Sequence, residues 1–303
     1  MGQDRPLLGI MLMLGFCALA PMGDAMAKLV GETIPLLMLL LWRFAVQAVL
    51  LLPFAVRDLG GLSARVWRLT ALRTALHIVG IGAMFASLRF LPLADAVAIA
   101  FVMPFIMLLL GKYFLNEEVG PRRLSACAVG FLGVMLVVQP SFAEVGAPAL
   151  LPLLVAVVFS FFMLVTRQVA REAAPVTLQL LSGLMGAPAL LALWLVFGGL
   201  HPDIAIRAPE GRELTLLLAI GGLGTFAHLL MTWSLRFAPS ATVAPMQYLE
   251  IPFATLIGWI VFRDLPNGLA ALGILITVGA GLYVIARERA TARAARTPAP
   301  PAA

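Results

Sequence analysis

The feature that most constrains this chain is a succession of apolar segments, each about as long as a membrane is thick. A helix needs about 20 mainly apolar residues to cross the hydrocarbon layer of a bilayer. Segments 124–138 and 268–285 contain no Asp, Glu, Lys, Arg or His at all. The chain is 62% hydrophobic and only 12% charged, whereas soluble domains are about 45–50% apolar and about 25% charged. We therefore predict an integral membrane protein.

Ten such segments can be marked along the sequence, which predicts an all-α membrane protein with ten transmembrane helices. The connections between them are too short to form a separate soluble domain. The expected segments are 7–26, 34–56, 71–90, 94–114, 124–138, 149–166, 176–197, 214–235, 241–262 and 268–286. We expect residues 287–303, which are rich in Arg, Ala and Pro, to form a disordered tail.

Basic residues are distributed unevenly between the segments, and this predicts the orientation of the chain. With a cytoplasmic N-terminus, 15 Lys and Arg residues fall on the inner side and 5 on the outer side, while Arg43 lies within a span. Positive charge collects on the cytoplasmic side of membrane proteins, so we expect both termini inside. We read the first segment as a span and not as a cleaved signal peptide, because Asp24 interrupts the approach to the A-x-A pattern at 25–27.

Several other classes of function find no support in the sequence. The formal net charge is +6, but the basic residues form short clusters between apolar segments, as in cytoplasmic loops rather than nucleic-acid surfaces. The sequence has no G-x-x-x-x-G-K-[ST] phosphate loop and no H-E-x-x-H zinc motif. The three histidines are scattered, and the two cysteines fall in apolar segments. We therefore predict no nucleic-acid partner, no metal, no cofactor and no catalytic residue.

A motif near residue 90 recurs near residue 237 and indicates an internal duplication. Residues 87–94 read SLRFLPLA and residues 234–241 read SLRFAPSA, an offset of 147. The two copies lie five predicted spans apart, and because five is odd they must point in opposite directions across the bilayer. Inverted-topology repeats are the architecture of many secondary transporters. We expect one five-helix repeat over residues 1–140 and a second, inverted repeat over residues 148–286.

These features resemble the drug/metabolite transporter superfamily, specifically its EamA-type members, which are built of two five-helix repeats. The resemblance rests on Arg43-Phe44 in the second span and on an ordered set of residues that occurs twice. The first set is Pro92, Pro104, Glu117-Glu118, Gly130 and Gly133, and the second is Pro239, Pro252, Asp264, Gly273, Gly279 and Gly281. Residues 244–250 also resemble a stretch in bacterial carriers of S-adenosylmethionine or riboflavin, while other EamA-type members export amino acids and their derivatives. The resemblance implies a small-metabolite transporter of the bacterial cytoplasmic membrane.

Polar side chains inside the predicted spans are the candidate substrate-binding residues. A charge at the centre of a bilayer costs at least about 2.5 kcal/mol, so each one is a functional hypothesis. Arg43 lies near the middle of the second span, with Gln47 one turn further along the same face. In the ninth span, Glu250 follows Gln247 and Tyr248, between prolines that free backbone carbonyls. A salt bridge between Arg43 and Glu250 that fixes packing is the structural alternative.

Two histidines complete the predicted site. His77 lies one turn after Arg73 in the third span, and His228 belongs to a polar stripe in the eighth span. His228 could carry protons because the reference pKa of histidine is about 6.5, although a lone histidine is more often a hydrogen-bonded packing residue. We expect Asp24 to be neutralised by Lys28 at i+4.

We predict a secondary transporter that works by alternating access, with a small-molecule substrate inside a lipid bilayer. Glu250 would bind a cationic group or a proton, Tyr248 would face a ring of the substrate, and Arg43 would balance or capture negative charge. The candidates for the substrate are S-adenosylmethionine, riboflavin, and amino acids or their derivatives. An intramembrane enzyme acting on lipid and a passive channel are the alternatives. Small-residue faces in the fifth and tenth spans serve either helix packing or a homodimer, and proton coupling and direction of transport stay open.

Overall fold

The structure is a computed structural model, and it describes residues 5–116, 120–265 and 268–294. Within these residues the chain forms helices and connecting turns, with no strand. In chain order the elements are α1 (Pro6–Val30), α2 (Leu36–Ala55), η1 (Val56–Gly61), α3 (Ala64–Ser87), α4 (Leu93–Ala100), α5 (Met103–Leu115), α6 (Pro121–Val145), η2 (Ala147–Leu150), α7 (Leu151–Val169), α8 (Pro175–Phe197), η3 (Pro202–Ile204), α9 (Arg212–Phe237), α10 (Ser240–Val243), η4 (Ala244–Leu249), α11 (Glu250–Phe262) and α12 (Gly268–Ala294).

Each of the ten predicted segments coincides with a helix or with a run of short helices. Among the described residues, seven helical segments are long and apolar enough to cross a membrane, and three shorter apolar helices accompany them. The protein is therefore a multi-pass membrane protein. Helix α12 continues past the predicted end at residue 286 to Ala294, so the first part of the expected tail is helical, and residues 295–303 lie outside the described part of the chain.

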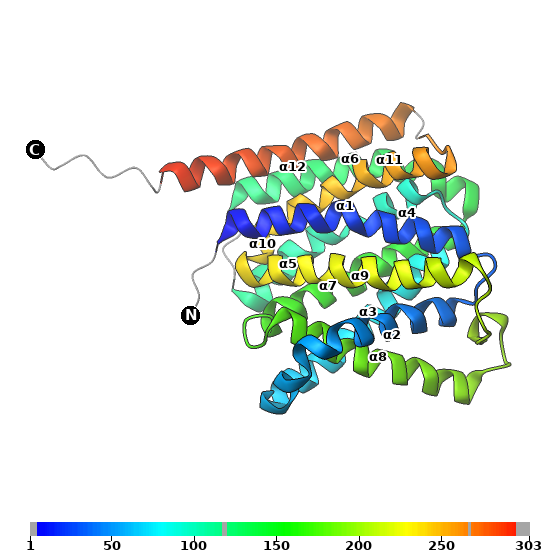
Figure 1. The fold of residues 1–303 in the computed structure, drawn as a ribbon. Helices are drawn as coiled ribbons and strands as arrows, with labels where there is room; N and C mark the ends of the chain where they lie inside the picture. The colour runs from blue at the N-terminus through cyan, green and yellow to red at the C-terminus, as the bar shows by residue number, and fades with distance from the viewer. Residues whose placement is uncertain (1–4, 117–119, 266–267, 295–303) are drawn as a thin grey trace, which may run out of the picture.

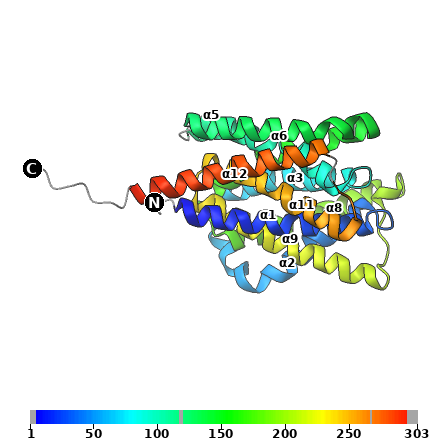
Figure 2. The same ribbon diagram turned by 90° about the horizontal axis from the view of Figure 1, so that it is seen from above.

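The long helices run side by side as one bundle, and α1 begins at the same end at which α12 stops (Figure 1). Helix α1 packs on α9, α2 on α8, and α3 on α7. Helices α6 and α12 lie side by side on one flank (Figures 1 and 2). Their small residues form this contact, because a Cβ on Gly133 would come within 2.7 Å of the Gly273 carbonyl oxygen. The small-residue faces of these two spans are thus occupied within the chain.

The two copies of the SLRF motif lie at opposite ends of α1. Arg89 lies where α1 stops, and its guanidinium donates a hydrogen bond of 3.3 Å to the carbonyl oxygen of Ile34. Phe237 lies where α1 begins, and its carbonyl oxygen accepts a hydrogen bond of 2.6 Å from the backbone N–H of Arg5. We call the end of the bundle at Arg89 the Arg89 end. We call the opposite end, at Phe237 and its neighbour Arg236, the Arg236 end.

The fourth predicted segment is a broken helix. Pro104 has no N–H to bond the carbonyl of Ala100, so one hydrogen bond of a regular helix is lost at this point. The chain turns at Phe101, whose N–H bonds the Ala98 carbonyl oxygen at 3.1 Å, and α5 then begins at Met103. The Met103 carbonyl oxygen accepts a hydrogen bond of 3.2 Å from the hydroxyl of Ser160 on α7.

The ninth predicted segment is broken in the same way. It passes from α10 through the 3-10 segment η4 into α11, and Pro252 cannot bond the carbonyl of Tyr248. The N–H of Glu250 bonds the carbonyls of Gln247 and Tyr248. The Met246 carbonyl oxygen accepts a weak hydrogen bond of 3.7 Å from the thiol of Cys17 on α1. Both breaks therefore place backbone carbonyls in the interior, where only protein groups can satisfy them.

Candidate functional site

A cavity lies in the half of the bundle nearer the Arg89 end. The empty space in this cavity and its open mouth is about 770 Å³. The last turns of α3 and the middle of α9 contribute to it, together with the second half of α1. The lining residues are Phe16, Leu19, Ala20, Gly23, Asp24, Arg43, Ile81, Met84, Phe85, Val97, Ala100, Phe101, Met103, Val155, Phe159, Ile220, Gly224, Ala227, His228 and Glu250.

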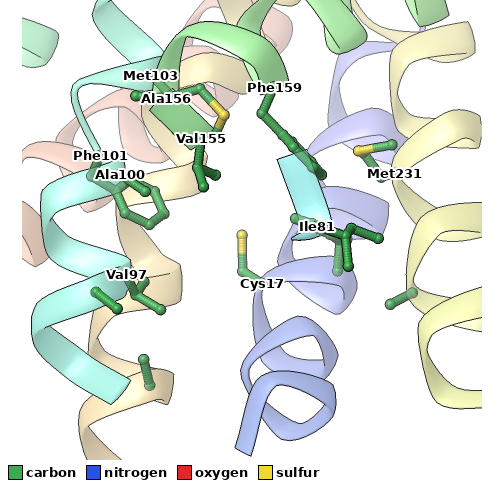
Figure 3. Packing of buried hydrophobic residues seen from close by; sticks show 14 of the residues in the cluster. Cys17, Ile81, Val97, Ala100, Phe101, Met103, Val155, Ala156, Phe159 and Met231 are labelled. Carbon is green, nitrogen blue, oxygen red and sulfur yellow. The ribbon is translucent and has the colours of Figure 1, made fainter. Parts of the chain in front are cut away.

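Aromatic and aliphatic side chains make up most of the cavity wall. Phe101, at the break between α4 and α5, lies near Val155 of α7, and Phe159 lies one turn further along α7 (Figure 3). Phe16 and Phe85 add rings from α1 and α3. Aromatic faces stack on flat ring systems and bury large apolar areas. The wall is thus suited to a planar, mainly apolar part of a ligand.

Arg43 brings a positive charge to this wall. It is only 2% exposed, and its Nη1 donates a hydrogen bond of 2.8 Å to Oε1 of Gln47. Its Nη2 lies 3.1 Å from Nδ1 of His228. The backbone of α9 comes so close that a Cβ at Gly224 would lie 2.3 Å from Nε of Arg43. Only glycine at position 224 therefore leaves room for the guanidinium in this position.

Two carboxylates face the same cavity. Glu250 is the first residue of α11, directly after the 3-10 segment, and Asp24 lies in the second half of α1. Among the described residues, no hydrogen bond or ion pair of either carboxylate is found, and the ion pairs of the structure lie elsewhere. The alternative salt bridge between Arg43 and Glu250 is therefore not formed. Both acids are available to a ligand.

His228 stands between Arg43 and the interior. Its Nδ1 lies 2.9 Å from the carbonyl oxygen of Gly224 and 3.1 Å from Arg43. A protonated Nδ1 donates to the carbonyl, whereas a bare Nδ1 accepts from the guanidinium, so the two bonds exclude each other. Nε2 of His228 has no partner among the described residues. The ring centroids of His228 and His77 are 4.4 Å apart.

A second polar cluster, centred on Arg73, closes the bundle between the cavity and the Arg236 end. Arg73 is fully buried, and its nitrogens bond hydroxyls of three other helices. Nε donates to Thr166 of α7 at 2.9 Å, Nη1 to Ser182 of α8 at 2.6 Å, and Nη2 to Thr232 of α9 at 3.4 Å. His77, one turn further along α3, stacks on Phe162 with ring centroids 4.6 Å apart. We call Arg73, His77, Thr166, Ser182 and Thr232 the Arg73 cluster.

The seven predicted site residues fall into three groups. Arg43, His228 and Glu250 line the cavity. Gln47 and His77 do not line it but contact residues that do, and Gln47 links Arg43 to the backbone of Gln179 on α8 through a hydrogen bond of 2.6 Å.

Gln247 and Tyr248 lie outside the cavity lining, in the packing of α1, α6 and α7 around η4. Nε2 of Gln247 lies 2.8 Å from the sulfur of Met163, and the hydroxyl of Tyr248 donates a bond of 3.1 Å to the Cys127 carbonyl. The ring of Tyr248 packs against Gly130, where a Cβ would approach to 2.5 Å. The ring of Tyr248 thus packs on α6 and does not line the cavity, although it contacts the cavity residue Phe101 with ring centroids 5.8 Å apart.

Sequence reasoning missed Asp24 as a cavity residue. It paired Asp24 with Lys28, but the Lys28 ammonium donates to the Leu91 carbonyl at 2.8 Å and lies 3.9 Å from Asp264. The signal was present, because a carboxylate within a predicted span is a functional hypothesis by default. Arg89 forms an ion pair of 2.6 Å with Asp203. Glu117-Glu118 lies outside the described residues.

Comparison with known proteins places this geometry in context. The model of the EamA-like transporter family matches residues 7–139 and 147–287. The chain is 29% identical over 263 residues to the riboflavin transporter of Brucella anthropi, covering 86% of this chain and 92% of the relative. It is 23% identical over 272 residues to the S-adenosylmethionine uptake transporter of Rickettsia prowazekii, covering 88% of each. A crystal structure with 18% identity has the same fold, with a TM-score of 0.68 over 92% of this chain and 95% of the other.

Proposed function

The chain belongs to the EamA-like transporter family, and on this premise we propose that it is a secondary transporter that moves a small metabolite across the bacterial cytoplasmic membrane by alternating access. The observation that carries the proposal is a cavity within the bundle whose two carboxylates form no hydrogen bond or ion pair with the described residues, and which the Arg73 cluster closes towards the Arg236 end. A channel needs a continuous path, and a carrier needs a path that is closed on one side at a time.

Helix pairing supports ten spans arranged as two inverted five-helix repeats. If α1 to α6 form the first repeat and α7 to α12 the second, the contact of α1 with α9 has its counterpart in the contact of α7 with α3. Helices α2 and α8, and α6 and α12, pair with their own counterparts. The bond from Ser160 to the break in the fourth span likewise has its counterpart in the bond from Cys17 to the break in the ninth.

The proposed orientation makes the Arg89 end the outer side. The excess of basic residues in alternate loops favours a cytoplasmic N-terminus, and α1 begins at the Arg236 end. The cavity then opens toward the outside, and the Arg73 cluster closes it toward the cytoplasm. This orientation does not determine whether the substrate is imported or exported, because that direction depends on how transport is coupled to an energy source.

A flavin is the substrate that the cavity favours. Four phenylalanines on its wall suit a flat ring system, the guanidinium of Arg43 suits ring carbonyl oxygens, and the carboxylates of Asp24 and Glu250 accept hydrogen bonds from hydroxyl groups. The riboflavin transporter of Brucella anthropi, similar over most of both chains, supports this choice.

An organic cation such as S-adenosylmethionine is a second candidate, which one observation favours. The cavity wall holds two carboxylates against a single guanidinium, and a positive ligand would compensate the second carboxylate. The S-adenosylmethionine uptake transporter of Rickettsia prowazekii is the relative that fits this reading. The Glu250→Gln variant separates the candidates, because loss of a carboxylate lowers the affinity for a cation more than the affinity for a neutral flavin.

Counterflow in proteoliposomes tests the proposed function. The liposomes are loaded with unlabelled riboflavin or S-adenosylmethionine, and entry of the labelled compound is measured at two values of pH. We expect saturable counterflow of riboflavin that an excess of unlabelled riboflavin competes away. Flux that rises linearly with concentration and shows no counterflow would identify a channel, and absence of flux for both compounds would overturn the proposed substrates.

A further inference from the structure

The Arg73 cluster holds a buried positive charge without a negative partner. None of the ion pairs among the described residues includes Arg73, and its bonds go to three neutral hydroxyls. The hydroxyls of Thr166 and Thr232 each donate to a carbonyl of their own helix, at 2.7 Å, and accept from Arg73 with a free lone pair. A charge so deep in the protein is costly even when it is hydrogen-bonded. Its presence at this depth therefore calls for a function.

His77 is a second polar group of the cluster that the present packing leaves unsatisfied. It is fully buried, and neither ring nitrogen has a hydrogen-bond partner among the described residues. An unpaired buried polar atom costs about 1–3 kcal/mol. Its neighbours on α2, α7 and α9 are the rings of Phe44, Phe162 and His228. The cluster thus contains two groups that a ligand could hydrogen-bond better than the present packing does. The guanidinium of Arg73 is a donor, and the imidazole of His77 is both a donor and an acceptor.

The internal repeat relates the Arg73 cluster to the cavity. Helices α3 and α9 are uninterrupted, so the offset of 147 that joins Arg89 to Arg236 extends along both of them. It places Arg73 on Ile220 and His77 on Gly224, which both line the cavity. In the other direction it places Phe85, a cavity residue, on Thr232 of the cluster. The position shared by Ile81 and His228 lines the cavity from both helices.

We propose that the Arg73 cluster is the inward-facing half of the substrate pathway, a second contact site that opens when the cavity at the Arg89 end closes. The inference rests on the proposed alternating access. If the two repeats exchanged their conformations, the residues that correspond to the cavity lining in the other repeat would line a cavity open to the inside. Arg73 then offers its N–H groups to an acceptor oxygen of the substrate, of the carbonyl or carboxylate class.

The hydroxyls of the cluster explain how Arg73 remains bonded in both states. In the closed state Thr166, Ser182 and Thr232 occupy its donors, and when the helices separate the acceptor oxygens of the substrate and water replace them. The two halves also differ in charge. The outer half presents two carboxylates beside the guanidinium of Arg43, and the inner half presents the guanidinium of Arg73, so a substrate with both donor and acceptor groups meets complementary chemistry on each side.

Sided cysteine labelling tests the inference. Thr232→Cys and its repeat counterpart Phe85→Cys are each placed in a Cys17→Ser, Cys127→Ala background, and a membrane-impermeant thiol reagent is applied to right-side-out and inside-out vesicles. We expect Phe85→Cys to react from outside only and Thr232→Cys from the cytoplasmic face only, with riboflavin slowing both reactions. Leu195→Cys, on the exposed surface of α8, is the lipid-facing control and should not react.

A second variant and a second measurement keep the two proposals distinguishable. Ser182→Cys replaces Thr232→Cys if the latter does not fold, and Arg73→Gln should raise the half-saturating riboflavin concentration at the cytoplasmic face about tenfold, with little change outside. Labelling of neither cluster cysteine, or labelling from outside, in protein that retains riboflavin counterflow would overturn the inner site and leave the transporter intact. Loss of counterflow in the unaltered protein would instead overturn the proposed function.

Discussion

Helices α3 and α9 border a cavity in one half of the bundle and close on a polar cluster in the other half. Toward the Arg89 end, α3 and α9 border a cavity in which Asp24 and Glu250 form no hydrogen bond or ion pair with any described residue. Toward the Arg236 end, the same two helices close on Arg73, each of whose nitrogens is bonded to a hydroxyl. The proposed inverted repeat would make the two halves equivalent in sequence position. The comparison teaches that their difference lies in which end is open, and the substitutions below test this.

The largest effect is expected from Gly224→Ala, which attacks the open half. A Cβ at this position would lie 2.3 Å from Nε of Arg43 and would displace the guanidinium from the cavity wall. A misplacement of about 1 Å can cost about 100-fold in rate, and we expect a loss of counterflow of that order. Gly222→Ala is the matched control, because its Cβ would have only one neighbour, at 3.9 Å, and should retain counterflow. Equal counterflow rates for the two variants would show that Arg43 has no role in the site.

Glu250→Gln is expected to have the next largest effect. It removes a carboxylate that forms no hydrogen bond or ion pair in the described part of the chain and that the proposed cycle offers to the substrate or a proton. Hydrogen bonds to charged groups contribute about 1.5–3 kcal/mol, which corresponds to about 10–100-fold in affinity. Counterflow of riboflavin and of S-adenosylmethionine at two values of pH measures the effect, with exposed Glu210→Gln as the control. Transport that is unchanged at both pH values would show that Glu250 has no role in binding.

Ser182→Ala weakens the closed half by a smaller amount. It removes the acceptor of the 2.6 Å bond from Arg73, and a typical hydrogen bond contributes about 1 kcal/mol, or about fivefold in a two-state equilibrium. The population should shift toward the inward-open state, so the labelling rate of Phe85→Cys from outside should fall severalfold. Ser125→Ala, whose hydroxyl bonds only its own helix, is the matched control. A labelling rate that does not change would mean that the cluster does not hold the inner side closed.

Tyr248→Phe should have the smallest effect. The ring packs against Gly130, and the hydroxyl bonds the Cys127 carbonyl, so its loss should lower stability by about 1 kcal/mol and leave the half-saturating concentration of riboflavin within about twofold. Thermal unfolding in detergent and counterflow measure the two quantities. A large rise in the half-saturating concentration with unchanged stability would restore the predicted role of Tyr248 in facing the substrate.

Hydropathy located the ten apolar helical segments, because the length of a span and its lack of charge can both be read from the sequence. The breaks at Phe101 and in η4 lie close to Pro104 and Pro252, but the sequence does not show that they contact Ser160 and Cys17, which lie far away along the chain.

The candidate site was harder to predict than the fold. Helix periodicity shows which residues share a face and not which neighbour that face meets. Arg43, His228 and Glu250 face the cavity, whereas Tyr248, two residues before Glu250, faces α6. Asp24 escaped notice because its sequence neighbour Lys28 offered a local partner, although Lys28 bonds Leu91 instead. Choices of this kind are made by tertiary packing.

The most direct test of the account is the sidedness of two repeat-related residues, Phe90 and Phe237. Each is replaced by cysteine in the Cys17→Ser, Cys127→Ala background and labelled with an impermeant thiol reagent in right-side-out and inside-out vesicles. Inverted repeats predict that Phe90→Cys reacts only from outside and Phe237→Cys only from the cytoplasm. Reaction of both cysteines from the same face would contradict the inverted arrangement and the carrier built upon it.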